Sequence, residues 1–498
     1  MPDRPAIPRE GTAADALLET MGAFGERDVD YAGGRTWSLV YWAGEAHHHL
    51  VERAFNAYMA TNALNPLAFQ SLKRMEREVV QMTASLLSGP ETACGTMTSG
   101  GTESLLLAVK TYRDRARKKT PWIRRPNMVV PETIHVAFDK ASAYFGVKKR
   151  VVPVLEDGRV DVAAMRRAID HNTIMLAASA PQYPTGAVDP IAEIGELALA
   201  EKLPLHVDAC FGGFILPWLE RLGVPLEPWD FRVPGVTSMS ADVHKYGYAP
   251  KGASVIVYRD MSWLRHQFFA VTGWSGGVYI SPSLQGTRAG GSIAAAWASL
   301  NGLGEEGFLR LARDAWEVAE RLRAGIRAIP GLRLLGRPDA TIVTWAAAER
   351  GGVDVYAVAD QLQAMGWSVD RQQRPPSVHC SAGAANLPVV DDYLRDLRAA
   401  VETVRANPGL AKEGEAAVYG LMAKVPVARL VKSEVLKVLE GMYGPGDGDV
   451  DLAAQDAPGG ARVAELVNRF GPPVQDALDR LRRARARFRL RLRLPRLR

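Results

Sequence analysis

The sequence predicts an α/β protein in which a mostly parallel sheet is covered by helices on both faces. Two observations support this fold class. Apolar runs of strand length alternate with helical patterns between about residues 65 and 305, as is typical of a parallel sheet. Residues with candidate chemical functions directly follow several of these runs, at the sheet edge where the active residues of such folds lie.

The predicted elements divide the chain into four parts. The runs predicted to be strands of the sheet are 127–131, 150–154, 173–179, 204–208, 235–238 and 254–258. They belong to a large domain at residues 65–305, which follows an N-terminal segment at 1–64 with a helix at 46–57. A smaller α+β domain is expected at 306–425, with helices at 307–329 and 355–365 and strands near 332–335 and 341–346. Residues 426–498 form a C-terminal extension.

Composition favours a cytoplasmic globular enzyme. Hydrophobic residues make up 47% and charged residues 23% of the 498 residues, which is ordinary for this class. The cysteines Cys94, Cys210 and Cys380 lie far apart and suggest no disulfide framework. We find no secretory signal and no apolar run long enough to cross a membrane. The consecutive histidines at 47–49 cannot all face one metal ion from a helix, so no metal site is predicted.

The net charge of +6 comes from the C-terminal tail. Residues 480–498 hold ten arginines and no acidic residue, which leaves 51 basic and 55 acidic residues elsewhere. The composition of the folded part therefore gives no support for nucleic-acid binding. Arginines alternate with apolar residues over 485–494, and two interpretations remain: a solvated, disordered tail, or a peripheral contact with an anionic membrane.

A lysine and an aspartate near predicted strand ends indicate a pyridoxal phosphate site. Lys245 lies in a loop between two apolar strands, and Asp208 ends a strand 37 residues earlier. A Schiff-base lysine needs a fixed, partly desolvated position, and the ring nitrogen of the cofactor needs a buried carboxylate. Each residue alone could be an ordinary turn lysine or strand-end aspartate. His206 either supports Asp208 or is a core histidine.

Two glycines open a long helical pattern after Thr98. The start of such a helix presents free N–H groups and the positive end of a dipole, which suits a phosphate. Gly100, Gly101 and Thr102 are therefore candidate cofactor-binding residues. Similar sequences begin ordinary helices, but here the motif occurs together with Asp208 and Lys245.

Longer motifs make the chain similar to the sphingosine-1-phosphate lyase family of the group II pyridoxal phosphate-dependent decarboxylase superfamily. The matching segments are 98–104, 135–146, 180–190, 205–213, 238–252 and 276–282. The resemblance spans roughly residues 35–425 and implies a fold-type I enzyme with a mostly parallel seven-stranded sheet, in the form that bacteria have. It also implies a homodimer with shared active sites, in which the loop 276–288 reaches the cofactor of the partner.

The resemblance assigns roles to further residues. The catalytic set that it implies is Lys245, Asp208, His135, Tyr41, Tyr183 and Tyr419, with His135 stacked on the cofactor ring. The cofactor-binding set further includes Gly100, Gly101, Thr102, His244 and Gly276. The substrate set is Lys251, Asn62, Asn65 and Tyr41, with Lys251 on the substrate phosphate.

One departure bears on the substrate. Asn65 stands where the family has a histidine, and it can donate a hydrogen bond but carries no positive charge. Lys251 and Asn65 could also be ordinary turn residues. We therefore expect a lyase that cleaves a phosphorylated sphingoid base to a long-chain aldehyde and ethanolamine phosphate. The alternatives are an amino-acid decarboxylase and a cofactor-free structural protein.

Overall fold

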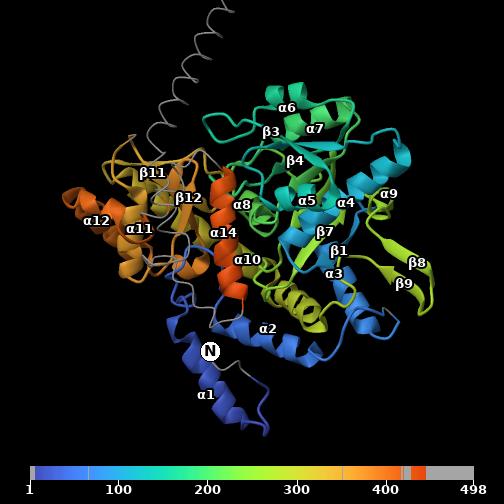
Figure 1. The fold of residues 1–498 in the computed structure, drawn as a ribbon, viewed down its shortest axis with the longest axis horizontal. Helices are drawn as coiled ribbons and strands as arrows, with labels where there is room; N and C mark the ends of the chain where they lie inside the picture. Colours follow the sequence, from blue (N-terminus) through green and yellow to red (C-terminus); the bar gives the residue numbers. More distant parts are fainter. Residues whose placement is uncertain (1–5, 66, 350, 417–418, 420–427, 445–498) are drawn as a thin grey trace, which may run out of the picture.

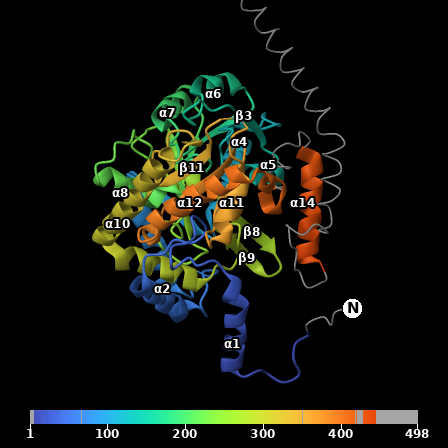
Figure 2. The same cartoon turned by 90° about the vertical axis from the view of Figure 1, so that its left-hand side faces the viewer.

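The computed structural model describes the chain except residues 1–5, 66, 350, 417–418, 420–427 and 445–498 (Figures 1 and 2). The Arg/Leu-rich tail at 480–498 lies outside the described residues.

The central sheet has seven strands in the order β1-β7-β6-β5-β4-β2-β3. The strands are β1 (Cys94–Thr98), β2 (Asn127–Pro131), β3 (Lys148–Val152), β4 (Thr173–Ser179), β5 (Leu205–Asp208), β6 (Val236–Ala241) and β7 (Ser254–Tyr258). All neighbouring pairs from β3 to β6 are parallel, and only β7 runs against its neighbours. This topology confirms the predicted fold class, although the short β1 was not predicted.

Helices cover both faces of this sheet, as the continuous burial of β2 requires. Met128 and Val130 belong to one apolar core, whereas Val129 between them belongs to the other. Helices α4 (Gly101–Lys119) and α5 (Ala137–Phe145) line the first core. The second core is lined by α3 (Gln70–Leu86), α6 (Val162–Ala168), α7 (Ile191–Ala200) and α8 (Leu216–Arg221). The short α9 (Met261–Leu264) follows β7.

A second, four-stranded antiparallel sheet has its own apolar core around Trp37, Trp345 and Tyr393. Its strands are β10 (Leu332–Leu334), β11 (Ile342–Ala347), β13 (Pro376–Ser381) and β12 (Asp370–Gln373) in that order. Helices α11 (Val355–Ala364) and α12 (Val390–Ala406) pack on it. The predictions did not include β12 and β13, which carry side chains of the site described below.

A long helix, α10 (Gly290–Arg327), joins the second core of the large sheet to the core of the four-stranded sheet. Its residues up to Ala315 belong to the former and its residues from Val318 to the latter. It is kinked at Gly304, whose φ of 59° is non-helical, so the helix predicted to begin at 307 begins at Gly290.

Three helices and a two-stranded hairpin lie at the periphery of these cores. Helix α2 (Glu45–Tyr58) packs on α10, whereas α1 (Ala14–Phe24) has no buried residue and projects from the body (Figures 1 and 2). The hairpin β8 (Phe269–Trp274) and β9 (Gly277–Ser281) extends beyond the large sheet (Figure 1). Helix α14 (Ala428–Tyr443) is the last described element. Among the described residues, none of the helices is both long and apolar enough to cross a membrane.

Candidate active site

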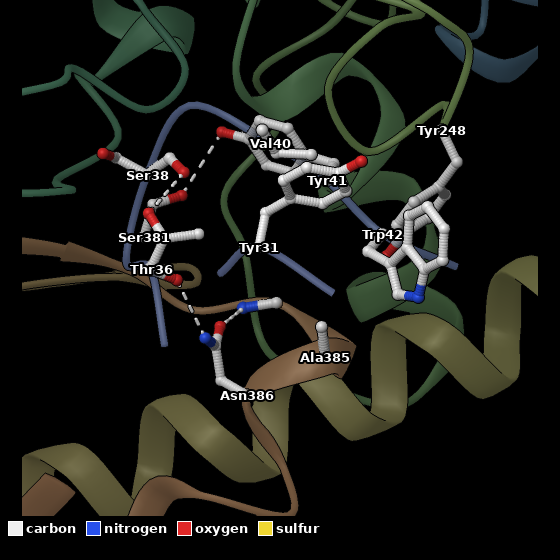
Figure 3. A pocket seen from close by; sticks show the side chains of 11 residues that line it. Tyr31, Thr36, Ser38, Val40, Tyr41, Trp42, Tyr248, Ser381, Ala385 and Asn386 are labelled. Atoms are coloured by element: carbon white, nitrogen blue, oxygen red, sulfur yellow. Dashed lines mark hydrogen bonds between the residues drawn. The ribbon is translucent and has the colours of Figure 1, made fainter. Parts of the chain in front are cut away.

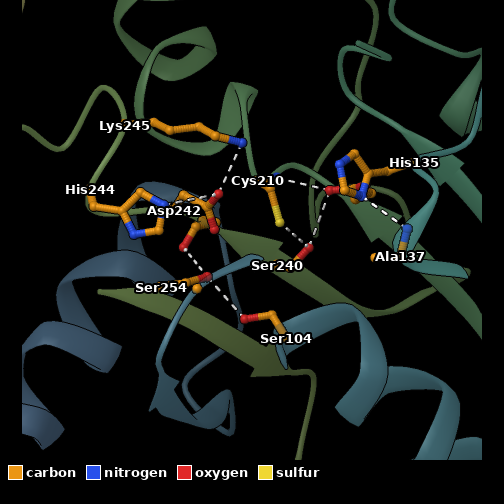
Figure 4. Close-up of polar contacts among 12 residues, drawn as sticks. Ser104, His135, Ala137, Cys210, Ser240, Asp242, His244, Lys245 and Ser254 are labelled. Carbon is orange, nitrogen blue, oxygen red and sulfur yellow. Dashed lines mark hydrogen bonds and ion pairs between the residues drawn. The ribbon is translucent and has the colours of Figure 1, made fainter. Parts of the chain in front are cut away.

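Lys245 lies in the loop between β6 and β7, and its ammonium group is held by a buried carboxylate. Its Nζ lies 2.9 Å from Oδ2 of Asp242, and Nε2 of His244 lies 3.7 Å from the same oxygen (Figure 4). Burial by itself would raise the pKa of Asp242, but the charges of Lys245 and His244 lower it. Burial likewise opposes the charged form of Lys245, yet Asp242 raises its pKa above the ordinary value. The pair is therefore an ammonium and a carboxylate.

The start of α4 forms a cradle beside this pair. A Cβ atom on Gly101 would lie 2.8 Å from Oδ2 of Asp242 and 2.9 Å from Sγ of Cys210, so only glycine fits there. Gly100 has a φ of +157°, and Thr102 in the first turn of the helix is exposed. Oδ1 of Asp242 is buried without a hydrogen-bond partner. The end of a 19-residue helix thus offers N–H groups beside Lys245.

Asp208 ends β5 and is 7% exposed. Its Oδ1 accepts a hydrogen bond from the Cys210 amide at 3.1 Å and lies 3.5 Å from the Ser240 hydroxyl. His206 is fully buried and contacts Ser240 and Ser238 rather than Asp208 itself. Because burial lowers the pKa of His206 to about 4, its ring is neutral and serves a hydroxyl network behind Asp208.

His135 follows β2 and has an exposed ring (Figure 4). Its Nδ1 accepts the Ala137 amide proton at 3.2 Å, which fixes the ring at the start of α5. The exposed ring leaves room for a flat partner, as the predicted stacking role requires.

Tyr41 brings the N-terminal segment to the site. Its ring packs edge-on against Tyr246 at 4.8 Å, and its hydroxyl lies 3.3 Å from Oγ of Ser381 on β13 (Figure 3). Nζ of Lys251 lies 5.4 Å from the centroid of the Tyr41 ring and donates to the carbonyl oxygen of His244 at 3.3 Å. Partial desolvation and the positive charge of Lys245 lower the pKa of Lys251 to about 8.

Tyr183 is held by two residues of the four-stranded sheet. Its ring stacks on His379 with centroids 4.1 Å apart, and its hydroxyl donates to Oδ2 of Asp370 at 2.8 Å. Tyr419 lies further along this sheet, against Tyr356 and under the guanidinium of Arg371. No described contact joins Tyr419 to Lys245.

A cavity of about 410 Å³ opens beside Lys251, between α2 and the loop after β6. Its lining is mainly apolar and includes Val40, Trp42, Val51, Phe55 and Tyr248, with Tyr41, His244 and Lys251 at one side. The volume lies within the range of small-molecule sites in proteins.

Besides Tyr419, three predicted residues are not brought into this cluster. Oδ1 of Asn62 accepts the Leu64 amide proton, and Oδ1 of Asn65 accepts the Leu67 amide proton, so both side chains cap local turns. Gly276 lies between the two strands of the projecting hairpin, where its neighbours are atoms of the Trp274 ring.

The residues present fit pyridoxal phosphate. Lys245, the carboxylate of Asp208, the exposed ring of His135 and the glycine-built helix start supply a nucleophile, a ring-nitrogen partner, a stacking surface and an anion cradle. Among the described residues, no group of three or more His, Cys, Asp or Glu side chains could hold a metal ion.

Comparisons with known proteins agree with this arrangement. The pyridoxal-dependent decarboxylase conserved domain matches residues 41–346. The sphingosine-1-phosphate lyase of Arabidopsis thaliana is 47% identical over 445 residues, which cover 88% of this chain and 81% of the relative. A probable sphingosine-1-phosphate lyase of Legionella pneumophila is 33% identical, and the match covers 76% of this chain and 64% of the relative.

Solved structures show the same fold. The structure of a sphingosine-1-phosphate lyase of Burkholderia pseudomallei has a TM-score of 0.79 and 38% identity, with 88% of this chain and 97% of that chain covered. A glutamate decarboxylase of Lactobacillus brevis shares the fold, with a TM-score of 0.70 at 20% identity. The match covers 80% of this chain and 95% of that chain.

Fold and site define a pyridoxal phosphate-dependent lyase of the decarboxylase superfamily. The cofactor is pyridoxal phosphate, as the lysine and aspartate motifs predicted. Within that superfamily the chain belongs to the sphingosine-1-phosphate lyase family, which confirms the predicted resemblance.

Four residues with contacts in the site were not predicted from the sequence: Asp242, Asp370, His379 and Ser381. For Asp242 a signal exists, because an aspartate three residues before a functional lysine can pair with it across one turn. The other three lie on β12 and β13, and their approach to Tyr183 and Tyr41 depends on how the two sheets are placed.

Proposed function

We propose that this protein cleaves the C2–C3 bond of a phosphorylated sphingoid base, which yields a long-chain aldehyde and ethanolamine phosphate. The observation that carries the proposal is the position of Lys251, between the Lys245–Asp242 pair and the apolar cavity. The relatives that share most of the chain bear the name of this activity. We place the enzyme in the reducing cytoplasm, where its three cysteines stay free.

The residues around the cofactor would divide the work as follows. Pyridoxal phosphate, when bound, supplies an acceptor for the electron pair of the broken bond. Lys245 would hold its aldehyde carbon, Asp208 would keep a proton on its ring nitrogen, and the α4 start would bind its phosphate. His135 would hold the ring plane, and Asp242 keeps Lys245 as an ammonium ion whenever the lysine is free.

Recognition of the substrate phosphate falls mainly on Lys251. Asn65 carries no charge, and its Oδ1 is engaged by the Leu67 amide, so it cannot replace the histidine of the family as a cation. The mainly apolar cavity beside Lys251 suits a long alkyl chain, and each buried methylene contributes about 0.8 kcal/mol. The cation that a decarboxylase aims at the substrate carboxylate is usually an arginine, and no arginine is among the described residues that line the cavity.

We further propose that the enzyme works as a homodimer whose hairpin β8–β9 completes the partner's site. The exposed side chains of this hairpin include Phe269, Trp274, Val278 and Ile280, each more than half exposed. Apolar side chains in such a projecting element favour contact with another protein surface. A second copy would cover them and bring Gly276 of one chain toward the cofactor of the other.

The proposed function is tested by product analysis of the purified holoenzyme. With a phosphorylated sphingoid base we expect a long-chain aldehyde and ethanolamine phosphate in equal amounts, without CO₂. Release of CO₂ from amino acids, with no aldehyde from the sphingoid base, would instead establish a decarboxylase.

A further inference from the structure

Tyr183, Asp370 and His379 form a compact group at the four-stranded sheet. The Tyr183 hydroxyl donates to Asp370, and its ring lies on the imidazole of His379. Asp370 and His379 face each other as register partners on β12 and β13. Tyr183 comes from the loop after β4, so the group joins the two sheets.

The aromatic part of this group is rigid and uncharged. His379 is fully buried, and neither ring nitrogen has a hydrogen-bond partner. Burial lowers the pKa of His379 to about 4, so the ring is neutral at physiological pH. Its contribution is therefore a flat surface that holds the phenol ring of Tyr183, rather than a proton or a charge.

The phenol itself cannot serve as a base on its own. Desolvation and the nearby Asp370 carboxylate raise the pKa of Tyr183 above its ordinary value, so the hydroxyl stays protonated. Lys245 and Tyr41 lie close enough to Tyr183 for their charges to act on its hydroxyl. Because its proton already points to Asp370, the lone pairs of Tyr183 are free to accept another.

The remaining charged and titratable groups near Asp370 do not compete for this role. Arg371, the adjacent cation, pairs with Asp360 and Glu415 instead. The groups on which the Asp370 charge acts are Tyr183, His379, Tyr41, Cys380 and Tyr419. None of these five carries a positive charge at neutral pH, which leaves Asp370 free to take a proton.

We propose that Asp370 is the proton acceptor of the cleavage step and acts through Tyr183, with His379 as a positioning residue. The inference rests on the proposed lyase function. The C3 hydroxyl of the substrate gives its proton to the Tyr183 oxygen while the Tyr183 proton passes to Asp370. The O–H electron pair becomes the second bond of the aldehyde, the C2–C3 bond breaks, and its pair stays with the head-group fragment. A proton returned through Tyr183 to C2 restores Asp370 and completes ethanolamine phosphate.

The test is a double-mutant cycle with Tyr183→Phe and Asp370→Asn in the holoenzyme. We expect each single variant to lower kcat about 10²-fold, with little change in KM and in the visible absorbance of bound pyridoxal phosphate. The double variant should be no slower than Tyr183→Phe alone, because both changes interrupt the same transfer. Losses that multiply, or an Asp370→Asn variant with unchanged kcat, would overturn the proposal.

Further variants separate proton transfer from structural support. Asp370→Glu should recover part of the activity and restore the acidic limb of the kcat–pH profile that Asp370→Asn loses. His379→Phe keeps a stacking ring and should stay within about threefold of wild type, whereas His379→Ala should lower kcat. Asp392→Asn removes an exposed charge from α12 of the same domain and should change nothing. Failure of wild type to produce aldehyde would refute the lyase function itself, whereas an active wild type with an additive cycle refutes only the relay.

Discussion

The active site has two walls, one around Lys245 on the large sheet and one around Tyr183 at the smaller sheet, and they are built in different ways. On the large sheet, Asp242, His244 and Lys245 come from four consecutive positions of one loop and contact each other directly. On the smaller sheet, Asp370 and His379 are nine positions apart and act on Tyr183, nearly two hundred residues earlier. The first wall carries charge within a contiguous motif, and the second carries a stacked aromatic pair, of which His379 is buried, and one carboxylate.

This difference teaches that the two walls do separate work. The Lys245 wall must hold a cofactor and therefore places the Lys245–Asp242 pair of one loop beside the start of α4. In the mechanism that we propose, the Tyr183 wall accepts and returns a proton, for which only the relative placement of a few groups matters. We therefore expect that substitutions can impair one wall and leave the other intact.

The largest effect is expected from Lys245→Ala. This change should lower kcat by at least about 10³-fold, because no other residue replaces a covalent nucleophile. The circular dichroism spectrum and the melting temperature should stay close to wild type, since Lys245 is held for chemistry. Lys73→Ala, an exposed lysine on α3, is the matched control. Loss of solubility in Lys245→Ala would contradict this role.

Substitutions in the β8–β9 hairpin test whether both walls need a second chain. Replacing Trp274 and Ile280 by serine should shift the protein to monomers and lower activity about tenfold or more. Sedimentation velocity over a range of concentrations measures the shift. The matched control Trp122→Ser removes another exposed tryptophan outside the hairpin and should leave the assembly unchanged. A fully active monomer would show that each chain holds a complete site.

A smaller effect is expected from Asp242→Asn, which removes only the charge beside Lys245. Asp242 raises the pKa of Lys245, so in the variant the amine becomes neutral at lower pH. Rebinding of pyridoxal phosphate to apoenzyme needs the neutral amine, and its pH dependence should move to lower pH by about one unit or more. Stopped-flow absorbance measures this midpoint. An unchanged midpoint would mean that Asp242 does not control the lysine.

The smallest effect concerns Lys251 and pH. Its lowered pKa of about 8 means that it is protonated below this pH and loses its charge above it. KM for a phosphorylated substrate should therefore be constant below about pH 7 and rise above pH 8, by up to about tenfold per unit. Lys251→Arg should keep KM flat over this range. A parallel rise in Lys251→Arg would assign the effect to another group.

The contrast between the walls also explains what could be predicted from the sequence. Strands β2, β4 and β7 were predicted at the bounds that the structure has, because each is a bounded apolar run. Strand β12 has the sequence Asp-Arg-Gln-Gln and no apolar alternation, so its place in a sheet follows only from its pairing with β13. The helix start at Gly290 was missed because the kink at Gly304 resembles a boundary.

The same reasoning applies to the site residues. Lys245, Asp208 and the glycines 100 and 101 follow from chemistry that needs those residue types near strand ends and helix starts. His379 could not be predicted, because a buried histidine without hydrogen-bond partners has no distinguishing sequence pattern. Its importance depends on the 4.1 Å stacking with Tyr183, which arises only when the two sheets come together.

The most direct test of the proposed function compares phosphorylated and unphosphorylated sphingoid bases of one chain length on the wild-type holoenzyme. We expect aldehyde from the phosphorylated base. Its kcat/KM should exceed that of the unphosphorylated base by about 10²-fold or more, because Lys251 binds a charged phosphate oxygen. Equal kcat/KM for the two bases, or no aldehyde from either, would contradict the proposed function.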